Sequence, residues 1–338
     1  MWWDDNKQLD IISIGDVVTD DFIELQKDQA RTYVDEHGTK TLAMEFGTKL
    51  PFVGRQVIEA VGNASNAAVA FTRMSLATGF AANVGDDQYG RDIIAALQER
   101  GVDTRFVKVN RGKASNYHFV LRYDSERTIL IKHEEYDYQW PQLHGKDVPR
   151  WMYFSSISEH ATPFHDQVSD WLDQNPDVKL AFQPGTFQME AGVERLKRIY
   201  ERSEVLVLNR EEAVLVGGGN HENVHDLIDK LHALGPKIVV VTDGPAGAYA
   251  SDGQNRWKMP LYPDPAPPID RTGAGDAFAS TFVGQLAKGN TVEGALQWAP
   301  INSMSVCQQV GAQAGLLSEE DLETWLQKAP EWYKPEKF

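Results

Sequence analysis

A glycine-rich turn between residues 270 and 276 carries the side chains best suited to chemistry in this sequence. Gly273 and Gly275, with only Ala274 between them, let the backbone turn tightly, and an apolar-periodic helix is predicted to begin directly afterwards. Such a turn directs several backbone N–H groups and the positive end of the helix dipole at one place, which suits an anion such as phosphate. Asp276 puts a carboxylate beside the same place.

Asp276 has two interpretations. Aspartate is a good helix N-cap, so the carboxylate could simply receive the backbone N–H groups of the first turn. A negative charge beside an anion-binding turn is unfavourable for holding phosphate alone. It is well placed, however, to take a proton from a hydroxyl that attacks the phosphate. We favour the second interpretation because of the rest of the chain.

Length and charge limit the class of protein. A chain of 338 residues can bury a large core, and we expect one large α/β domain with an appendage. The formal net charge of −16 argues against a nucleic-acid-binding surface but leaves small anionic ligands open. The single Cys307 lies in an apolar, helical stretch and is predicted to be a buried small hydrophobe. Met1-Trp2-Trp3-Asp4-Asp5 lacks a signal-peptide layout and no apolar run reaches membrane length, so we expect a cytoplasmic protein without membrane contact.

Two strand-rich excursions interrupt the first third of the chain. A buried parallel strand over 11–18 is followed not by a helix but by alternating patches at 21–25 and 41–46, typical of half-exposed strands. Helices are predicted from 62 to 74 and 89 to 100, on either side of a strand at 76–84. The second excursion is a hairpin, with strands at 117–123 and 128–132 around the turn 124–127.

From residue 151 the pattern becomes regular. Strands are predicted at 151–155, 179–182, 205–208 and 238–241, alternating with helices at 165–173, 191–202, 224–234 and 276–287. Alternation of this length predicts a doubly wound, mostly parallel sheet covered on both faces. The excursions cannot fit into that sheet, so we expect them to pack together as one small antiparallel layer. Residues after 318 are predicted to add a short helix and a polar end.

Polar residues gather where predicted strands end. Asn209, Thr242 and Asp276 all follow strands or begin helices, where open α/β sheets bind ligands. Simpler interpretations exist for each segment. Asn209 and Glu212 have the spacing of a helix capping box. Thr242-Asp243-Gly244 could be a plain turn, and Asp20 an ordinary turn carboxylate.

The chain resembles the ribokinase-like carbohydrate kinases, the PfkB family, from about Asp10 to Leu317. Asp270-Arg271-Thr272-Gly273-Ala274-Gly275-Asp276 is similar to the C-terminal signature of that family, and Gly62-Asn63-Ala64-Ser65-Asn66 to its N-terminal signature. The resemblance implies that Gly273, Ala274 and Gly275 form an anion hole for the transferred phosphoryl group. It also implies that Asp276 is the catalytic base.

Further roles follow from the resemblance alone. Asp20, Gly62, Asn63 and Asn66 would bind the substrate; Asn209, Thr242, Asp243, Gly244 and Gly247 would bind ATP. Glu212 would act on Mg²⁺ through water, and the resemblance also raises a monovalent cation near Asp270. The ribokinase-like domain would span 9–317, with lid segments at about 19–61 and 115–133, followed by a C-terminal helix and tail at 318–338. The lid would close over the sugar and pair two subunits in a homodimer.

Three features of the sequence depart from the family pattern. Val61 stands where many members have the first of two glycines, so lid closure would be smaller or pivot elsewhere. Asn63 replaces a lysine, and Gln183-Pro184-Gly185 stands where Asn-Pro is common. Arg122 and Lys132 are interpreted as solvated faces of lid strands; the alternative is that they, with Arg271 and His133, face the pocket and favour an acidic or phosphorylated substrate.

Together these observations predict an ATP-dependent kinase that phosphorylates a hydroxymethyl group of a small sugar of the ribose, fructose or keto-deoxy sugar class. One alternative is a nucleoside kinase of the same family, since nucleosides also present a ribose hydroxymethyl group. Another is a catalytically idle regulator that binds sugar or nucleotide. The presence of Asp276 after a complete Gly-Ala-Gly turn argues against the regulator, because a sensor needs no base.

Overall fold

The structure is a computed structural model that describes residues 8–124, 126–221 and 223–338. Residues Met1–Asp5 and Ser125 of the predicted hairpin turn lie outside this range. The body of the molecule contains a ten-stranded sheet in the order β16-β15-β14-β13-β12-β11-β10-β1-β6-β7. Its parallel strands are β1 (Ile11–Ile14), β6 (Thr78–Gly85), β7 (Val107–Asn110), β10 (Trp151–Phe154), β11 (Lys179–Phe182), β12 (Ser203–Asn209) and β13 (Ile238–Thr242). An antiparallel edge follows: β14 (Ala248–Ser251), β15 (Arg256–Met259) and β16 (Glu336–Lys337).

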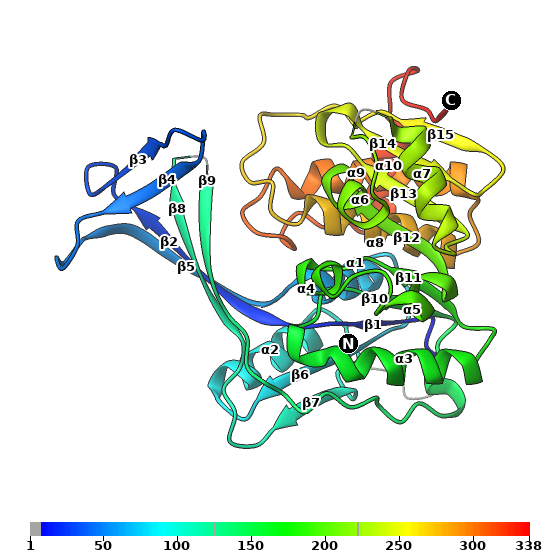
Figure 1. Ribbon diagram of the computed structural model, residues 1–338, viewed down its shortest axis with the longest axis horizontal. Coiled ribbons are helices and arrows are strands. Elements are labelled where there is room, and N and C mark those ends of the chain that lie inside the picture. Colours follow the sequence, from blue (N-terminus) through cyan, green and yellow to red (C-terminus); the bar gives the residue numbers. More distant parts are fainter. Residues whose placement is uncertain (1–7, 125, 222) are drawn as a thin grey trace.

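Helices cover both faces of this sheet, as the strand–helix alternation predicts (Figure 1). Consecutive residues of a strand point to opposite faces, and accordingly Ile11 and Ile12 belong to different hydrophobic cores. The helices are α1 (Asn63–Arg73), α2 (Gln88–Glu99), α3 (Thr162–Gln174), α4 (Thr186–Ala191), α5 (Lys197–Arg202), α6 (Arg210–Gly217), α7 (Val224–Ala233), α8 (Ala274–Ala287), α9 (Val292–Val306) and α10 (Glu319–Gln327). Short 3₁₀ turns occur at Gly145–Asp147, Glu159–Ala161 and Gly244–Ala246. No described helix is long and apolar enough to cross a membrane.

The excursions form a lid that extends away from the body (Figure 1). Its main sheet has the order β5-β2-β8-β9, from β2 (Val18–Leu25), β5 (Phe52–Val61), β8 (Tyr117–Tyr123) and β9 (Glu126–Lys132). β2 and β8 pair in parallel because both run outward from the body, while β5 and β9 return antiparallel to them. The prediction of one small layer is wrong for β3 (Ala30–Val34) and β4 (Lys40–Met44), which form a separate two-stranded sheet.

Two further predictions differ from the structure. The helix expected over 191–202 is broken, because α4 ends at Ala191 and Gly192 adopts a positive φ of 84° before α5 begins at Lys197. The tail is more than a polar end. β16 joins the main sheet beside β15, and the buried Tyr333 packs edge-on against Tyr262 with ring centroids 4.8 Å apart.

Candidate active site

The glycine-rich turn begins α8 at Ala274, two residues earlier than the sequence predicts. Gly273 occupies the N-cap position with φ 81°, and a β-carbon there would overlap Ala312. Only glycine therefore fits at this position. Gly275 differs, because the space that a β-carbon would enter there is open. The open space lies at the first turn of the helix, where free backbone N–H groups attract an anion.

Asp276 is not an N-cap. It is the third residue of α8 and is buried, and its carboxylate accepts hydrogen bonds from Asn63 Nδ2 at 2.9 Å and Asn66 Nδ2 at 2.8 Å. Gln183 Nε2 donates a third bond at 3.3 Å. Burial raises the pKa of the Asp276 carboxyl, and these three hydrogen bonds oppose the rise only in part. The result is a carboxylate with an elevated proton affinity, held in a fixed position, as a general base requires.

A second set of contacts fixes the groups that hold Asp276. Asn66 Oδ1 accepts from Gln313 Nε2 at 2.8 Å, and the same amide donates to the Ala60 carbonyl at 2.7 Å. Gln183 Oε1 accepts from the Tyr153 hydroxyl. Both polar atoms of the Asn66 side chain, which is predicted to bind substrate, are thus hydrogen-bonded inside the protein. It positions Asp276, whereas Asn63 also lines the cavity beside it.

A cavity of about 230 Å³ brings most of the predicted chemical groups together. It is lined by Asn63, Gln183, Val207, Leu208, Asn209, Glu212, Thr242, Gly273, Gly275 and Asp276. The capping box predicted for Asn209 and Glu212 is present, with Glu212 N–H donating to Asn209 Oδ1 at 2.8 Å and Asn209 N–H to Glu212 Oε2 at 2.9 Å. Burial raises the pKa of the Glu212 carboxyl, and the charge of Asp276 raises it further.

The Glu212 carboxylate suits a divalent cation that is bound largely through water. It borders the same small cavity as Asp276, and a hydrated cation there would reduce the cost of burying the Glu212 charge. Within the described residues, no group of three or more His, Cys, Asp or Glu side chains could enclose a metal ion. This donor set fits Mg²⁺, which usually keeps several waters and binds protein through one or two carboxylates and the phosphates of a substrate.

A larger cavity of about 410 Å³ adjoins the first. Its lining residues are Thr242, Gly244, Pro245, Gly247, Leu261, Tyr262, Asp264, Pro268, Arg271, Ala274, Gly275, Phe278, Pro300, Ser303, Met304 and Cys307. Thr242 and Gly275 line both cavities, so the two spaces are neighbours. Of the residues predicted to bind nucleotide, Thr242, Gly244 and Gly247 lie here, but Asp243 does not. Its carboxylate instead accepts from Arg210 Nη1 at 2.7 Å.

The lid borders a third cavity, also of about 410 Å³, at the loop before α8. It is lined by Phe22, Arg122, Asp124, Glu126, Arg127, Pro268, Ile269, Asp270 and Arg271. Arg122 is half-buried and lines this cavity, whereas Lys132 is 71% exposed and pairs with Glu134. Arg127 Nη1 lies 3.8 Å from Asp270 Oδ1. Asp270 also accepts from the Thr272 N–H and hydroxyl and from the Gly311 N–H.

Asp20 lies on lid strand β2 and is not among the residues that line the Asp276 cavity. Its Oδ1 is 3.3 Å from His118 Nδ1, but Oδ1 has no hydrogen-bond partner among the described residues. Gly62, at φ 122°, lets the chain pass close to the start of the lid, since a β-carbon there would lie 2.9 Å from the Asp16 carbonyl oxygen. Val61 is buried at the end of β5 and pairs with Val18.

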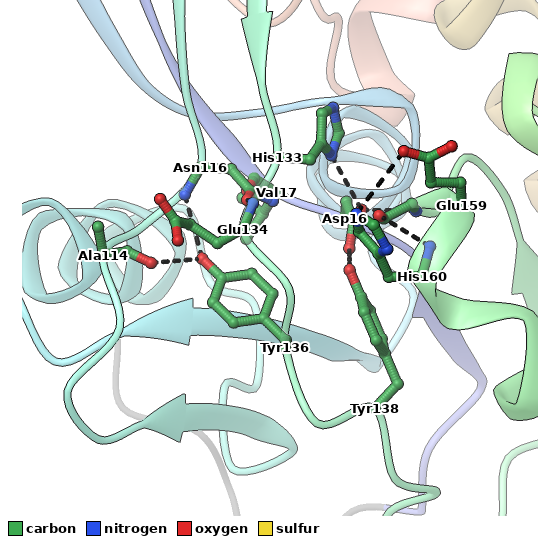
Figure 2. A network of polar contacts seen from close by, with 11 residues as sticks. Asp16, Val17, Ala114, Asn116, His133, Glu134, Tyr136, Tyr138, Glu159 and His160 are labelled. Carbon is green, nitrogen blue, oxygen red and sulfur yellow. Dashed lines mark hydrogen bonds and ion pairs between the residues drawn. The ribbon is translucent and has the colours of Figure 1, made fainter.

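Asp16 is a buried carboxylate near the base of the lid that the sequence analysis did not single out. Its buried carboxylate accepts from the Tyr138 hydroxyl at 2.8 Å and from the Ser158 N–H at 2.8 Å, and lies 3.3 Å from His133 Nδ1 (Figure 2). Burial, followed by the charge of Asp16, raises the pKa of Tyr138. The signal was available, because Gly15-Asp16 directly follows the first strand, where ligand-binding residues of parallel sheets gather.

The fold and these cavities define a class. A doubly wound sheet, an anion-binding helix start beside a buried carboxylate and a β lid belong to an enzyme that moves a phosphoryl group onto a small molecule. The sequence model of the "pfkB family carbohydrate kinase" matches residues 41–319. The chain belongs to this family and is a sugar kinase. The sequence-based family and fold assignments are thereby confirmed.

Similar proteins carry sugar-kinase names. The chain is 28% identical to a ribokinase of Bacillus subtilis over 274 residues, covering 78% of this chain and 87% of that protein. It is 25% identical over 247 residues to probable fructokinase-5 of Arabidopsis thaliana, covering 68% and 74%. A 5-dehydro-2-deoxygluconokinase of Bacillus velezensis is 26% identical over 257 residues, covering 70% and 76%.

Solved structures share the fold. Arabidopsis thaliana ribokinase complexed with ribose and ATP superposes with a TM-score of 0.77 at 20% identity, covering 95% of this chain and 99% of that one. A putative ribokinase II of E. coli in complex with ATP and Mg²⁺ gives a TM-score of 0.73 at 19% identity, covering 95% and 99%. The ribokinase-like arrangement of sheet and lid is thus the fold of this chain.

Proposed function

We propose that this protein transfers the γ-phosphoryl group of ATP to a hydroxymethyl group of a small sugar, with Asp276 as the general base. The observation that carries the proposal is the Asp276 carboxylate. It is buried beside the anion-binding turn, held by three side-chain amides, and has a raised pKa. A structural acid would cap the helix or pair with a Lys or Arg side chain, and among the described residues Asp276 does neither.

The reaction follows from this geometry. The sugar hydroxyl donates its hydrogen to Asp276, and its oxygen forms a bond to the γ-phosphorus as the bond to the ADP oxygen breaks. Asp276 keeps the proton, and the backbone N–H groups at Gly273, Ala274 and Gly275 stabilise the charge on the transferring group. Asp20, Gly62 and Asn63 would hold the sugar, while Asn66 acts on it only through Asp276.

We propose that the larger cavity is the nucleotide site, in which Thr242, Gly244 and Gly247 contact the nucleotide. Asn209 would face the phosphates from the smaller cavity, and Asp243 would act only by fixing Arg210 and the loop. When bound, Mg²⁺ neutralises charge on the phosphates, and Glu212 would hold its waters. Because the Asp270 carboxylate already accepts three hydrogen bonds, a monovalent cation here would bind mainly through carbonyl oxygens. A reaction that consumes ATP fits a cytoplasmic enzyme.

An ADP-release assay on Asp276→Asn tests the function. We expect kcat to fall by about 10²–10⁴, the usual loss when a general base is removed. The melting temperature should change little, because the loss of one hydrogen bond is offset by removal of a buried charge. Asp170→Asn is the matched control, since Asp170 is exposed and pairs with Arg198 on the surface. Retained kcat in a folded Asp276→Asn protein would contradict the proposal.

We also propose that the lid pairs two subunits. Large apolar side chains are exposed on the lid strands and their loops: Phe46, Phe52, Val53, Phe119 and Leu130. Phe119 is 42% and Leu130 52% exposed on adjacent strands, and an unpaired sheet face of this kind suits a second copy of itself. Sedimentation at micromolar concentration should give a dimer that Phe119→Asp converts to monomer. A strictly monomeric parent protein would rule this out.

A further inference from the structure

Asp276 lies at one end of a chain of hydrogen bonds whose other end is a cation. Asn66 Nδ2 donates to Asp276 Oδ2 at 2.8 Å, and Gln313 Nε2 donates to Asn66 Oδ1 at 2.8 Å. Arg100 Nη1 in turn donates to Gln313 Oε1 at 2.7 Å, although Arg100 is not among the residues that line the Asp276 cavity. We propose that Arg100 is a positioning residue, which acts through these two amides to keep an N–H group directed at the proposed base. The inference rests on the proposed kinase function.

The chain joins four separate segments of the body. Arg100 directly follows α2, and Gln313 lies in the loop between α9 and α10. Asn66 is the fourth residue of α1, and Asp276 the third residue of α8. Arg100 is half-buried and the other three side chains are buried. Hydrogen bonds in such surroundings are electrostatically stronger than in water, and members of a chain polarise one another.

The chemistry of the two ends gives the chain one direction. A guanidinium group only donates hydrogen bonds, and an ionised carboxylate only accepts them. Each amide between them has one oxygen and one NH₂ group, so it must turn its oxygen toward Arg100 and its NH₂ group toward Asp276. A reversed amide would face two donors or two acceptors toward each other. Arg100 and Asp276 therefore require the same orientation of both amides.

A β-bulge at the base of the lid holds the Arg100 end of the chain. At this point β5 has one residue more than its partner β2, and the bulge consists of Glu59 and Ala60. Ala60 has a φ of 61°, which is uncommon for a residue with a β-carbon. The Glu59 carbonyl accepts from Arg100 Nη1 at 3.1 Å, and the Ala60 carbonyl from Gln313 Nε2 at 2.7 Å. Rotation of the Gln313 amide would thus break three hydrogen bonds.

Arg100 differs from an arginine that only stabilises the end of a helix. Arg202, the last residue of α5, shows the structural use, because its guanidinium donates to backbone carbonyls of the loop between α3 and β11. Arg100 directs its shorter hydrogen bond to a side-chain amide instead. Among the described residues, it forms no ion pair with a carboxylate. Its charge is therefore available to polarise the chain.

Loss of Arg100 should reach Asp276 through the two amides. Gln313 Oε1 would lose its donor, and the Gln313 amide would no longer be held in one orientation. The hydrogen bond from Asn66 to Asp276 would weaken, and this bond opposes the rise of the Asp276 pKa that burial causes. The pKa should therefore rise further. Asp276 would then be protonated, and inactive as a base, at a higher pH than in the parent protein.

The test is the pH dependence of kcat/KM for the sugar, measured by ADP release. Arg100→Met should move the acid limb to higher pH and lower kcat about fivefold at neutral pH, as expected for coupling within one hydrogen-bond network, with an unchanged KM for ATP. Arg100→Lys should lie closer to the parent protein in both quantities, because an ammonium group also only donates. The control Arg202→Met should lower the melting temperature and leave the acid limb in place.

A double variant separates action through the chain from action of the charge through space. If Arg100 acts through Asn66, Arg100→Met combined with Asn66→Ala should behave like Asn66→Ala alone in kcat and in its acid limb. Effects that add in full, or an acid limb that stays in place in Arg100→Met, would overturn this inference and leave the kinase function standing. If Arg100→Met does not fold, Gln313→Glu makes the same comparison, alone and with Asn66→Ala, because it replaces a donor by an acceptor of the same shape.

The parent protein tests the kinase function separately. Failure to phosphorylate any sugar in a panel of neutral, acidic and phosphorylated sugars would overturn the proposed function, and this inference with it.

Discussion

The two ends of the active cleft are built differently. At the body end, both oxygens of Asp276 receive hydrogen bonds, and two of the three donors, Asn66 and Gln183, are themselves held by Gln313 and Tyr153. At the lid end, Thr19 Oγ1, Asp20 Oδ1 and His118 Nε2 are buried without partners among the described residues. The proposed catalytic group is thus held by side chains of the protein itself, whereas these lid-end atoms have no such partners among the described residues.

This difference has energetic consequences. A buried polar atom that stays unpaired costs roughly 1–3 kcal/mol, so a ligand that pairs with the lid-end atoms would stabilise that end of the cleft. Substrate binding would satisfy these atoms and stabilise the closed lid. The body bears a different cost, the burial of an ionised Asp276, which its three amide donors reduce only in part. Such a cost is expected where a carboxylate must work as a base near neutral pH.

The largest expected effect comes from the body end, at the two glycines of the turn. Gly273→Ala should unfold or strongly destabilise the protein, by about 1–3 kcal/mol or more, because it adds a left-handed, non-glycine residue and an overlap with Ala312. Gly275→Ala should leave the melting temperature unchanged or slightly higher, since the new methyl group enters open space within a helix. The measurement is thermal unfolding of both variants beside the parent protein.

Kinase activity gives a second test of the two glycine variants. If the space beside Gly275 receives the transferring phosphoryl group, Gly275→Ala should lower kcat/KM for ATP about tenfold or more despite its intact fold. Equal stability of the two variants would mean that Ala312 gives way at no cost. Full activity in Gly275→Ala would remove this position from the anion hole.

The sequence predicts more of the body than of the lid. The main sheet and its helices can be predicted from regular apolar runs, and the turn 270–276 from its two glycines. Each of these signals lies within a short stretch of neighbouring residues. The role of Asp276 could not be settled that way. Its carboxylate is held by Asn63 and Asn66, more than two hundred residues away, and the helix begins two residues before it. Pattern alone therefore could not distinguish a cap from a base.

The sequence predicts the strands of the lid but not which of these strands pair with one another. Both excursions show the alternation of half-buried strands, yet alternation does not say which strands pair, and β3 with β4 turned out to stand apart. Asp16 and His133 are 117 residues apart in the chain, so no local pattern joins them. Asp16 alone could have been found from its place after the first strand.

A middle-sized effect should follow from loosening the support of Asp276. Asn66→Ala removes one of the hydrogen bonds that lower the pKa of Asp276, so this pKa should rise further above its ordinary value of 3.8. A base works only when ionised, and kcat/KM should therefore begin to fall at a higher pH than in the parent protein as the solution is acidified. We expect kcat at neutral pH to drop about tenfold, within the range typical of general-base contributions. The measurement is kcat/KM across pH.

Stability provides a check on this variant. Asn66→Ala also leaves Gln313 Nε2 with one partner fewer, so unfolding should cost about 1–3 kcal/mol less. Asn175→Ala, which removes an amide bonded to the Trp171 carbonyl at the end of α3, is the control for the loss of a half-buried asparagine. An acid limb that stays in place in Asn66→Ala, with normal behaviour of Asn175→Ala, would show that Asp276 does not govern the pH profile.

The smallest effect should come from the contact that joins the two regions. Arg127 of the lid lies 3.8 Å from Asp270 of the body, and its side chain is 40% exposed. Because an exposed ion pair contributes only about 0–1 kcal/mol, Arg127→Ala should leave the melting temperature unchanged. It should raise the sugar KM no more than about fivefold, which corresponds to about 1 kcal/mol, and the difference should shrink at high salt. Lys27→Ala is the matched control, since Lys27 pairs with Asp124 within the lid. Steady-state kinetics at two salt concentrations measure both variants.

If Arg127→Ala and Lys27→Ala behave alike, the Arg127–Asp270 contact does not bias lid position, and the lid closes through substrate contacts alone. A fall of a hundredfold or more would instead mean that Arg127 touches the reacting groups, and the lid could no longer be regarded as the region of recognition only.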